Sequence, residues 1–416
     1  MRYSLLDYLA CPICHDELAC IVTEEVPSVM PATLFPDGQR VGAGTGVGPV
    51  PNWPRGGRLA ALLTQAASPA VNPERGREVE VASGLLACGT CGRWFPIDGT
   101  IPELLPDHLR DAGRERPLFE AGVRDLPGDL RQALEAFRPT GDAQADPGAH
   151  YKRAEIGIKS KIDDPAFFGP GFSSPFNPWN SSFTTYLISL FGTVVPFLEL
   201  ERGGVVVDSG CGYSWSTEWL FRSGYDAIGV DICRTYLEIA VQRIGTFRPH
   251  LVVGDVENLP LRSGVANAIL AYESFHHIPD RKKALAGYHR VMGRSGRVIL
   301  AEPGAAHEKA EVAVDAMQKY GILEKGMDLS DVIGYAAGTG FNPPEQVFVF
   351  STSSGDRAAR IDDEFARRHS TLHSNVFRLT KGPRVAQAFA HPPLSRHSPI
   401  GRALRRARSA LRLGPS

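Results

Sequence analysis

The sequence has 416 residues, of which 43% are hydrophobic and 22% are charged, so it is long enough to bury at least one full core and up to three folded units. Lys and Arg total 45 against 46 Asp and Glu, which excludes a global basic field that would hold nucleic acid without sequence preference. No stretch approaches 18 consecutive apolar residues, and the first residues lack the apolar segment and cleavage site of a signal peptide. These features predict a cytoplasmic protein.

Composition divides the chain into four regions. Residues 1–105 contain two Cys-x-x-Cys pairs, separated at about 22–82 by a Pro- and Gly-rich insertion that we do not expect to pack a core. Residues 106–165 are charged and mixed, and we interpret them as a linker with some helix. Between 166 and 352, β-branched runs alternate with helix-length segments, which predicts a doubly wound α/β domain with a parallel sheet. Residues 353–416 form a polar and then basic extension.

The cysteines indicate a metal site in the first region. Four of the seven lie in two close pairs, Cys11 with Cys14 and Cys88 with Cys91. Two such pairs can supply the four thiolates of a closed tetrahedral Zn²⁺ site, and the long gap between them does not exclude it because loop-closure entropy grows only logarithmically. Free thiols, or a ligand set that includes His15 or Cys20, are the alternatives. A site filled by four thiolates has no position for water, so we expect this zinc to be structural.

The residues around both pairs resemble the zinc ribbon of the small activator subunits of tRNA and protein methyltransferases, which also occurs fused to bacterial methyltransferases. The matching features are Cys-Pro-x-Cys in LLDYLACPICHDEL, the second pair, and the run Phe-Pro-Ile-Asp-Gly-x-Ile-Pro that follows it. The resemblance covers about residues 4–20 and 84–106, and it implies an N-terminal zinc-ribbon domain.

The stretch VVVDSGCGYSWSTEWL, residues 205–220, predicts a buried strand that ends at Asp208, a glycine turn, and a helix. Gly210 and Gly212 allow the backbone to pass close to a ligand, and the helix that begins near Ser214 offers its N-terminal amides. A pyrophosphate loop for NAD is disfavoured, because its later glycine position is occupied here by Trp215.

Further features follow in a fixed order. The next strand, residues 227–230, ends in Asp231, whose carboxylate could accept hydrogen bonds from both hydroxyls of a ribose. Then come LVVGDVENLP, which contains Asp255, a strand at residues 268–271, and a helix, turn and strand in YHRVMGRSGRVILAEP. Four features in this order make a nucleotide-type cofactor site a much stronger prediction than the glycine loop alone.

This order resembles the class I S-adenosylmethionine-dependent methyltransferases, particularly the ubiquinone- and menaquinone-biosynthesis group, over about residues 203–303. The resemblance implies a seven-stranded Rossmann-like sheet and S-adenosylmethionine as cofactor. It assigns the cofactor contacts as follows: Asp208, Gly210 and Gly212 at the methionine part, Asp231 at the ribose, Asp255 and Val256 at the adenine, and Tyr272 after the fourth strand. Ser214 stands at the position of the family's usual third glycine, and we expect it to act as the N-cap of the following helix.

Transfer of a sulfonium methyl group requires mainly positioning, and a neutral oxygen acceptor additionally requires a base. The stretch AYESFHHIPD offers His277, followed by His276 and Glu273, as candidate catalytic residues. The alternative is that one or both histidines only hydrogen-bond the loop. The aromatic-rich residues 167–186 could form a lid with Trp179 or Tyr186 toward the substrate, or a helix packed on the sheet edge.

The C-terminal residues 391–416 contain six Arg and no Asp or Glu. On a helix these arginines would cover one face, which fits docking on an anionic membrane surface, an acidic partner or RNA. A frayed, solvated tail is the alternative. Membrane docking would place the protein peripherally at the inner membrane face.

The leading functional prediction is an S-adenosylmethionine-dependent methyltransferase that acts on a small-molecule or glycan-type acceptor, preferably at oxygen. One alternative is an rRNA or tRNA methyltransferase in which the ribbon presents the RNA. Nucleic acid is the less favoured acceptor, because the ribbon segments are rich in Asp and Glu. The other alternative is a scaffold protein that keeps both folds without turnover.

Overall fold

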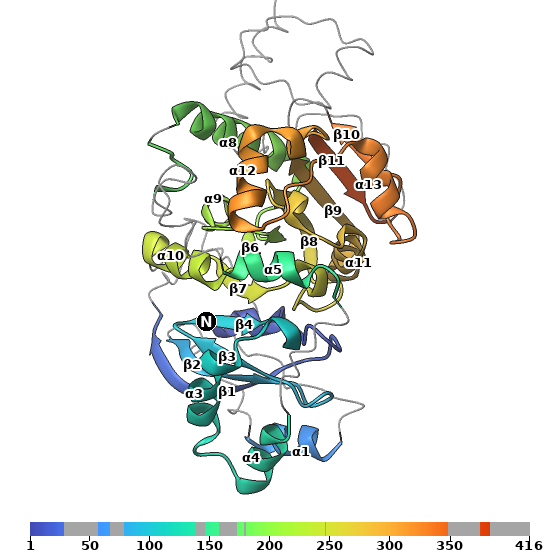
Figure 1. Cartoon of the computed structure of the whole chain (residues 1–416). Helices are drawn as coiled ribbons and strands as arrows, with labels where there is room; N and C mark the ends of the chain where they lie inside the picture. Colours follow the sequence, from blue (N-terminus) through green and yellow to red (C-terminus); the bar gives the residue numbers. More distant parts are fainter. Residues whose placement is uncertain are drawn as a thin grey trace, which may run out of the picture. The chain divides into compact units, whose positions relative to one another are not determined.

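The computed structural model describes residues 1–28, 57–66, 79–137, 146–157, 173–178, 180–245, 247–347 and 375–382. Trp179, most of the insertion and the basic tail lie outside these residues, so the expectations for them stay predictions. The described strands form one eleven-stranded sheet with the order β1-β2-β3-β4-β7-β6-β5-β8-β9-β11-β10 (Figure 1).

Seven of these strands form a doubly wound α/β domain. In spatial order they are β7 (His250–Gly254), β6 (Asp226–Asp231), β5 (Val205–Ser209), β8 (Ala266–Tyr272), β9 (Met292–Glu302), β11 (Asn375–Thr380) and β10 (Glu345–Val347). The first five are parallel, whereas β11 pairs antiparallel with both of its neighbours. This topology confirms the predicted Rossmann-like seven-stranded sheet. It also includes β11, which lies beyond the boundary that we set at residue 352.

Helices cover both faces of this sheet (Figure 1). They are α5 (Ala149–Ile156), α8 (Ser181–Val194), α9 (Trp215–Arg222), α10 (Arg234–Ile244), α11 (Arg281–Val291), α12 (Glu311–Tyr320) and α13 (Leu329–Ala336). Alternate residues of β5 face different cores, because side chains alternate along a strand. Val206 packs in a cluster with residues of α8 and α9, and Val207 packs in another with residues of α11. Burial on both faces explains the unbroken apolar run of β5.

One helical stretch among the described residues is apolar enough to be compared with a membrane span. Residues Ser181–Leu198, which comprise α8 and the 3-10 helix η5 (Val195–Leu198), have a mean hydropathy of 1.4 over 18 residues. Leu187, Leu190 and Phe191 are buried in the same core cluster as Val206. A single stretch of this kind is weak evidence for a span, because helices of a protein core share this composition.

The N-terminal half is built around an antiparallel arrangement of β1 (Ala19–Pro27), β2 (Val79–Ala87), β3 (Trp94–Asp98) and β4 (Ile101–Leu104). β1 and β2 extend into the region that we interpreted as insertion. Three helices pack near these strands, namely α1 (Arg58–Ala66), α3 (Ala112–Val123) and α4 (Gly128–Glu135). Leu63, Leu85, Phe119 and Leu130 form their common core. The segment after residue 105 is therefore packed on the N-terminal strands through α3 and α4.

The two halves share a sheet and a core. β4 pairs parallel with β7, so that Glu103 lies opposite Val253 and Leu104 opposite Gly254. Near the first cysteine pair, the N–H of Ala10 donates a 2.9 Å hydrogen bond to the carbonyl of Pro260. One core cluster contains N-terminal residues and residues of the α/β domain, and each fully buried side chain of this kind contributes about 1.5–3 kcal/mol. The N-terminal half therefore covers what would otherwise be the β7 edge of the α/β sheet.

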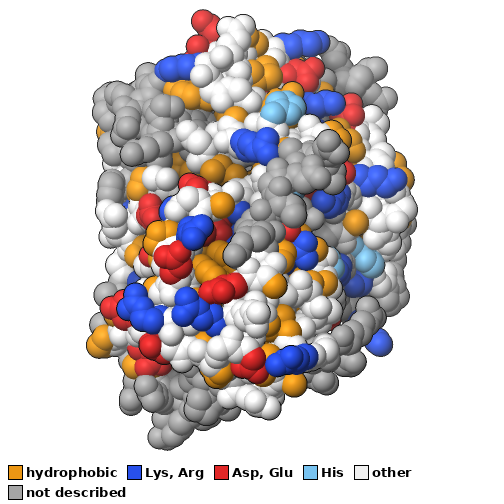
Figure 2. All heavy atoms as spheres, turned by 60° about the horizontal axis from the view of Figure 1, so that its bottom comes forward, with side chains coloured by type: hydrophobic (Ala, Val, Ile, Leu, Met, Phe, Trp, Pro, Cys, Tyr) orange, Lys and Arg blue, Asp and Glu red, His pale blue; other side chains and the backbone are white. Residues whose placement is uncertain are grey.

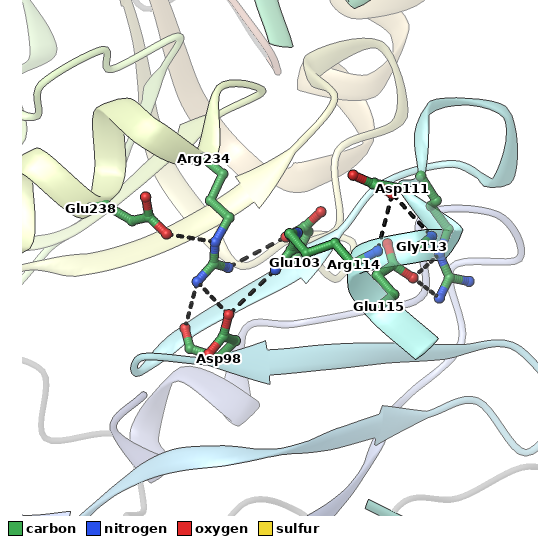
Figure 3. Close-up of polar contacts among 9 residues, drawn as sticks. Asp98, Glu103, Asp111, Gly113, Arg114, Glu115, Arg234 and Glu238 are labelled. Carbon is green, nitrogen blue, oxygen red and sulfur yellow. Dashed lines mark hydrogen bonds and ion pairs between the residues drawn. The ribbon is translucent and has the colours of Figure 1, made fainter. Parts of the chain in front are cut away.

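An ion-pair network joins α10 to the β3–β4 turn (Figure 3). Arg234 lies 3.0 Å from Oδ2 of Asp98 and 3.3 Å from Oε2 of Glu103, and it donates a further 3.0 Å hydrogen bond to the carbonyl of Asp98. Arg114 of α3 contacts the same two carboxylates. Arg234 is mostly buried and lies three residues after Asp231, the last residue of β6. The network therefore connects the N-terminal half to the end of β6.

Replacement of Arg234 by alanine should lower the free energy of unfolding by about 2 kcal/mol, since it removes a charge-assisted hydrogen bond from the buried carboxylate of Glu103 and two hydrogen bonds from Asp98. Chemical denaturation followed by circular dichroism measures this change. Arg116 is the matched control, because it forms an exposed pair with Glu120 at 2.9 Å. Its replacement should change stability by less than about 0.5 kcal/mol. Equal effects of the two substitutions would contradict a stabilising role for the buried network.

Candidate functional site

A cavity of about 250 Å³ lies at the carboxyl ends of β5, β6, β7 and β8. This is where ligands bind in open α/β sheets. Most residues predicted to contact the cofactor or the acceptor line it: Gly210, Gly212, Asp231, Asp255, Val256, Tyr272, Glu273 and His277. Two predicted residues, Asp208 and His276, are not among the lining residues.

The glycine turn after β5 forms one wall of the cavity. Gly210 and Gly212 have φ values of +71° and +52°, which are unfavourable for other residues. A Cβ atom on Gly210 would come within 2.6 Å of Cβ of Ser274 in the opposite wall. The turn is therefore shaped by two positions where glycine is required by conformation and, at Gly210, by close approach.

Asp231 fixes this turn against the end of β6. Its carboxylate accepts 2.8 Å hydrogen bonds from the N–H groups of Gly212 and Cys233. Burial raises the pKa of Asp231 to about 6, although these hydrogen bonds oppose the shift. The side chain lines the cavity and still has lone pairs to accept donors from a bound ligand.

Asp208 lies behind the turn rather than in the cavity wall. Its carboxylate accepts 2.6 Å hydrogen bonds from the hydroxyls of Ser216 and Thr217 at the start of α9. Burial raises the pKa of Asp208 to about 6 as well. The expected direct contact with a cofactor is thus replaced by an arrangement in which Asp208 positions the first turn of α9.

Ser214 stands at the N-cap position of α9, as predicted, but its side chain does not cap the helix. It is fully buried with φ of 59°, and its hydroxyl lies 3.3 Å from Sγ of Cys211. A residue with a Cβ costs about 1–2 kcal/mol in this left-handed conformation. The left-handed backbone conformation, rather than a capping hydrogen bond, therefore explains why glycine is favourable at this position.

Asp255 and Val256 follow β7 and line the cavity, as predicted. The carboxylate of Asp255 accepts hydrogen bonds from Nζ of Lys152 at 3.0 Å and from the side-chain amide of Asn258 at 2.6 Å. Lys152 also contacts Asp146 at 2.8 Å and Glu257 at 2.5 Å, so its ammonium group fills the centre of this acidic cluster. The sequence analysis missed Lys152, because it lies in the segment that we interpreted as a linker.

Aromatic side chains form the wall beside β8. Tyr272 and Trp215 both line the cavity and pack edge to face, with ring centroids 5.7 Å apart. The hydroxyl of Tyr272 donates a 2.7 Å hydrogen bond to the carbonyl of Leu187 in α8. α8 therefore packs on the sheet, as in the second alternative, while its Phe183 and Leu187 line the cavity; the lid stays a prediction.

Glu273 and His277 bring titratable groups to the same wall. Glu273 accepts a 2.7 Å hydrogen bond from the hydroxyl of Tyr186, and burial raises its pKa. Nδ1 of His277 lies 2.7 Å from the carbonyl oxygen of Leu323, which can only accept, so Nδ1 carries the proton. In the neutral imidazole Nε2 is then the atom that can take a proton.

His276 lies outside the cavity wall, in contrast to its predicted place beside the acceptor. Its Nδ1 is 2.7 Å from Oε2 of Glu302, and its Nε2 is 3.4 Å from Oε2 of Glu324. Burial alone lowers the pKa of His276, but these two carboxylates raise it to about 10. His276 thus acts in the supporting structure of the η7 turn (Phe275–His277), and the sequence offered no signal for its two carboxylate partners.

A second candidate site is the cysteine cluster of the N-terminal half. The Sγ atoms of Cys11 and Cys91 lie 3.6 Å apart, and those of Cys14 and Cys88 lie 3.4 Å apart. Tetrahedral zinc with Zn–S distances of about 2.3 Å places sulfur atoms roughly 3.8 Å from one another. All four ligand atoms lie within 4.8 Å of one another, and the group contains neither His15 nor Cys20. The four thiols can therefore hold a tetrahedral metal ion with a small adjustment.

Comparisons with known protein families match both halves. Residues 207–300 match the methyltransferase domain family, and residues 2–99 match the Trm112p-like protein family. The two predicted resemblances are thus confirmed. The chain combines a Trm112p-like domain with a Rossmann-like methyltransferase domain.

Individual relatives match shorter parts of the chain. Methyltransferase GfsG of Streptomyces halstedii is 28% identical over 145 residues, which are 34% of this chain and 52% of the relative. The 18S rRNA (guanine-N(7))-methyltransferase RID2 of Arabidopsis thaliana is 33% identical over 117 residues, 24% of this chain and 40% of the relative. The chain thus spans about half or less of these relatives' length.

Among solved structures, the complex between the Haloferax volcanii Trm112 methyltransferase activator and a methyltransferase contains a similar chain. The match has a TM-score of 0.40 and 16% identity, and it covers 50% of this chain and 94% of that chain.

Proposed function

We propose that this chain transfers the methyl group of S-adenosylmethionine to an oxygen atom of a small-molecule or glycan-type acceptor. The observation that carries the proposal is one cavity in which the glycine turn and Asp231 form one wall, and Glu273 and His277 form another. A nucleotide-type cofactor site and groups able to handle a proton thus meet at the carboxyl ends of the strands.

Each of these cavity residues has a distinct role in the proposed reaction. S-adenosylmethionine, when bound, supplies an electrophilic methyl group on a positively charged sulfur. Asp231 would accept hydrogen bonds from the ribose hydroxyls, and Trp215 and Tyr272 would exclude water beside the reacting groups. His277, with Nδ1 held as a donor, would take the proton of the acceptor hydroxyl at Nε2. The acceptor oxygen then forms the bond to the methyl carbon as the carbon–sulfur bond breaks.

The lining of the cavity supports a small acceptor. Phe176, Phe183 and Leu187 add apolar surface to its lining. An O-methyltransferase of Penicillium expansum is also among the relatives, at 29% identity over 116 residues, 26% of this chain and 42% of the relative.

RNA is the second candidate acceptor, because the chain carries a Trm112p-like domain and one relative is an rRNA methyltransferase. The distribution of charged side chains makes RNA the less favoured acceptor. Figure 2 shows a face on which Lys and Arg side chains lie among Asp and Glu side chains rather than in a separate basic patch. Backbone contacts to RNA favour a local concentration of positive charge.

The test has a binding step and a turnover step. Calorimetric titration of the purified, zinc-loaded protein with S-adenosylmethionine and S-adenosylhomocysteine should give one site per chain with micromolar affinity. Release of S-adenosylhomocysteine is then measured with panels of hydroxyl-bearing small molecules, short glycans, lipids and RNA transcripts. Turnover with RNA alone would replace the proposal by the second candidate. Absence of cofactor binding by folded protein would support a scaffold role.

A further inference from the structure

Beside the cavity wall, four side chains capable of binding a metal converge from three segments. His276 and His277 belong to η7, His307 begins the 3-10 helix η8 (His307–Lys309), and Glu324 lies in the segment between α12 and α13. Ligand atoms of His276, His277 and Glu324 all lie within 4.8 Å of one another. His307 reaches the same carboxylate, since its Nε2 is 2.9 Å from Oε2 of Glu324.

The separations around Glu324 suit a transition-metal ion. Nε2 of His276 and Nε2 of His307 lie 3.4 Å and 2.9 Å from the same oxygen, Oε2 of Glu324. Nitrogen and oxygen ligands at about 2.0–2.2 Å from a metal lie roughly 3–3.5 Å from one another. An ion could therefore replace the direct contacts between imidazole and carboxylate with little movement of the side chains.

An outer shell supports the central histidine. Nδ1 of His276 lies 2.7 Å from Oε2 of Glu302, so its Nε2 faces Glu324. Glu302 is fully buried and also accepts hydrogen bonds from backbone N–H groups, at 2.9 Å from Phe275 and at 3.3 Å from Ser274 and His276. Metal-binding histidines typically make such a bond to a carboxylate through the second ring nitrogen, which fixes ring orientation and tautomer.

Charge distinguishes this cluster from the acidic cluster at Asp255. There the ammonium group of Lys152 already occupies the centre. Within the described residues, Glu302 and Glu324 form ion pairs only with histidines. A divalent cation that displaces the proton of His276 would compensate these two buried carboxylates more fully than the imidazolium does.

We propose that Glu324 binds a divalent transition-metal ion together with His276 and His307. A set of imidazoles and one carboxylate favours Zn²⁺, Fe²⁺, Co²⁺ or Ni²⁺ over Mg²⁺ and Ca²⁺. His277 directly follows His276 and lines the cavity, so the ion would lie close to the part of the cavity where the acceptor binds. Its positive charge there would favour an acceptor that carries oxygen ligands. This consequence for the acceptor rests on the proposed methyl transfer, but metal binding does not.

The metal content of the full chain tests this site. After dialysis against a mild chelator and titration with Co²⁺, wild-type protein should hold a second equivalent beside the metal of the cysteine cluster. That equivalent should show visible absorption without the near-ultraviolet thiolate-to-cobalt band. Glu324→Gln and His307→Ala should lose it, and Glu302→Gln should weaken it by about 10–100-fold. His150→Ala is the control, since His150 is exposed on α5 and lies outside the cluster.

Circular dichroism and binding of S-adenosylhomocysteine are measured on the same samples. Folded protein that binds S-adenosylhomocysteine but takes up no second equivalent of Co²⁺ would overturn the metal site and leave the proposed function intact. The site would also be overturned if Glu324→Gln and His307→Ala bound Co²⁺ as the His150→Ala control does. Uptake of Co²⁺ without cofactor binding would support the metal site and contradict the proposed function.

Discussion

Cys14→Ser should unfold the N-terminal half of the protein and destabilise the α/β domain with it. The substitution removes one of four sulfur ligands at an atom that is only half-buried, so the direct loss of packing is small. Structural zinc contributes about 10–16 kcal/mol of apparent binding free energy in small zinc domains, as much as the entire stability of a typical domain, about 5–15 kcal/mol. The expected loss is therefore larger than that of any single core substitution.

The loss should spread because the halves share a sheet. Cys11 directly follows Ala10, whose N–H bonds Pro260 of the α/β domain, and β4 covers the edge of β7. β7 ends at the residue before Asp255, so the cavity wall depends on an edge that the N-terminal half protects. We expect a single thermal transition at lower temperature, rather than loss of one domain and persistence of the other.

Zinc content by elemental analysis, thermal melting by circular dichroism and limited proteolysis measure this effect. Cys20→Ala is the matched control, because Cys20 is a buried cysteine of β1 outside the cluster. It should keep one zinc ion and lose only about 1 kcal/mol of stability. Wild-type protein that contains no metal and melts at the same temperature as Cys14→Ser would show that the cluster is a set of free thiols.

Local sequence signals were sufficient for the parts of the site that lie within one strand–turn–helix unit. Asp231 could be predicted because it ends an apolar strand, and the glycine turn because two glycines follow another such strand. In both cases the strand and the residues that follow its end are neighbours in the chain. The four cysteines could be grouped despite their separation, because metal-ligand spacing is a strong local pattern.

Features that depend on tertiary contacts had no such signal. The pairing of β4 with β7 joins residues about 150 positions apart, and neither strand's sequence specifies the other as its partner. Lys152 and Glu324 reach the site from segments without a motif, and their roles come from the carboxylates and histidines that surround them. Asp208 and His276 carry the right residue types, but tertiary packing turns both away from the cavity.

Asp231→Ala should weaken binding of S-adenosylhomocysteine by roughly 100-fold. The substitution removes the acceptors for two ribose hydroxyls, and each hydrogen bond to a carboxylate is worth about 1.5–3 kcal/mol, so a combined loss of about 3 kcal/mol is a conservative expectation. It also releases the N–H groups of Gly212 and Cys233, which loosens the turn. Calorimetry measures the affinity. Glu238→Ala is the control, because the side chain of Glu238 in α10 is 44% exposed and does not line the cavity.

The pH dependence separates ligand binding from stability at this residue. Burial raises the pKa of Asp231 from 3.8 to about 6, so protonation below pH 6 should remove the ribose acceptor and weaken binding. Stability changes in the opposite direction: the stabilising contribution of a group with a raised pKa is complete below pH 3.8 and is lost as pH rises through about 6. Asp208 has the same pKa shift without lining the cavity, so Asp208→Asn should alter only the stability profile. If Asp231→Asn left the pH dependence of binding unchanged, Asp231 would not be the group that holds the ribose.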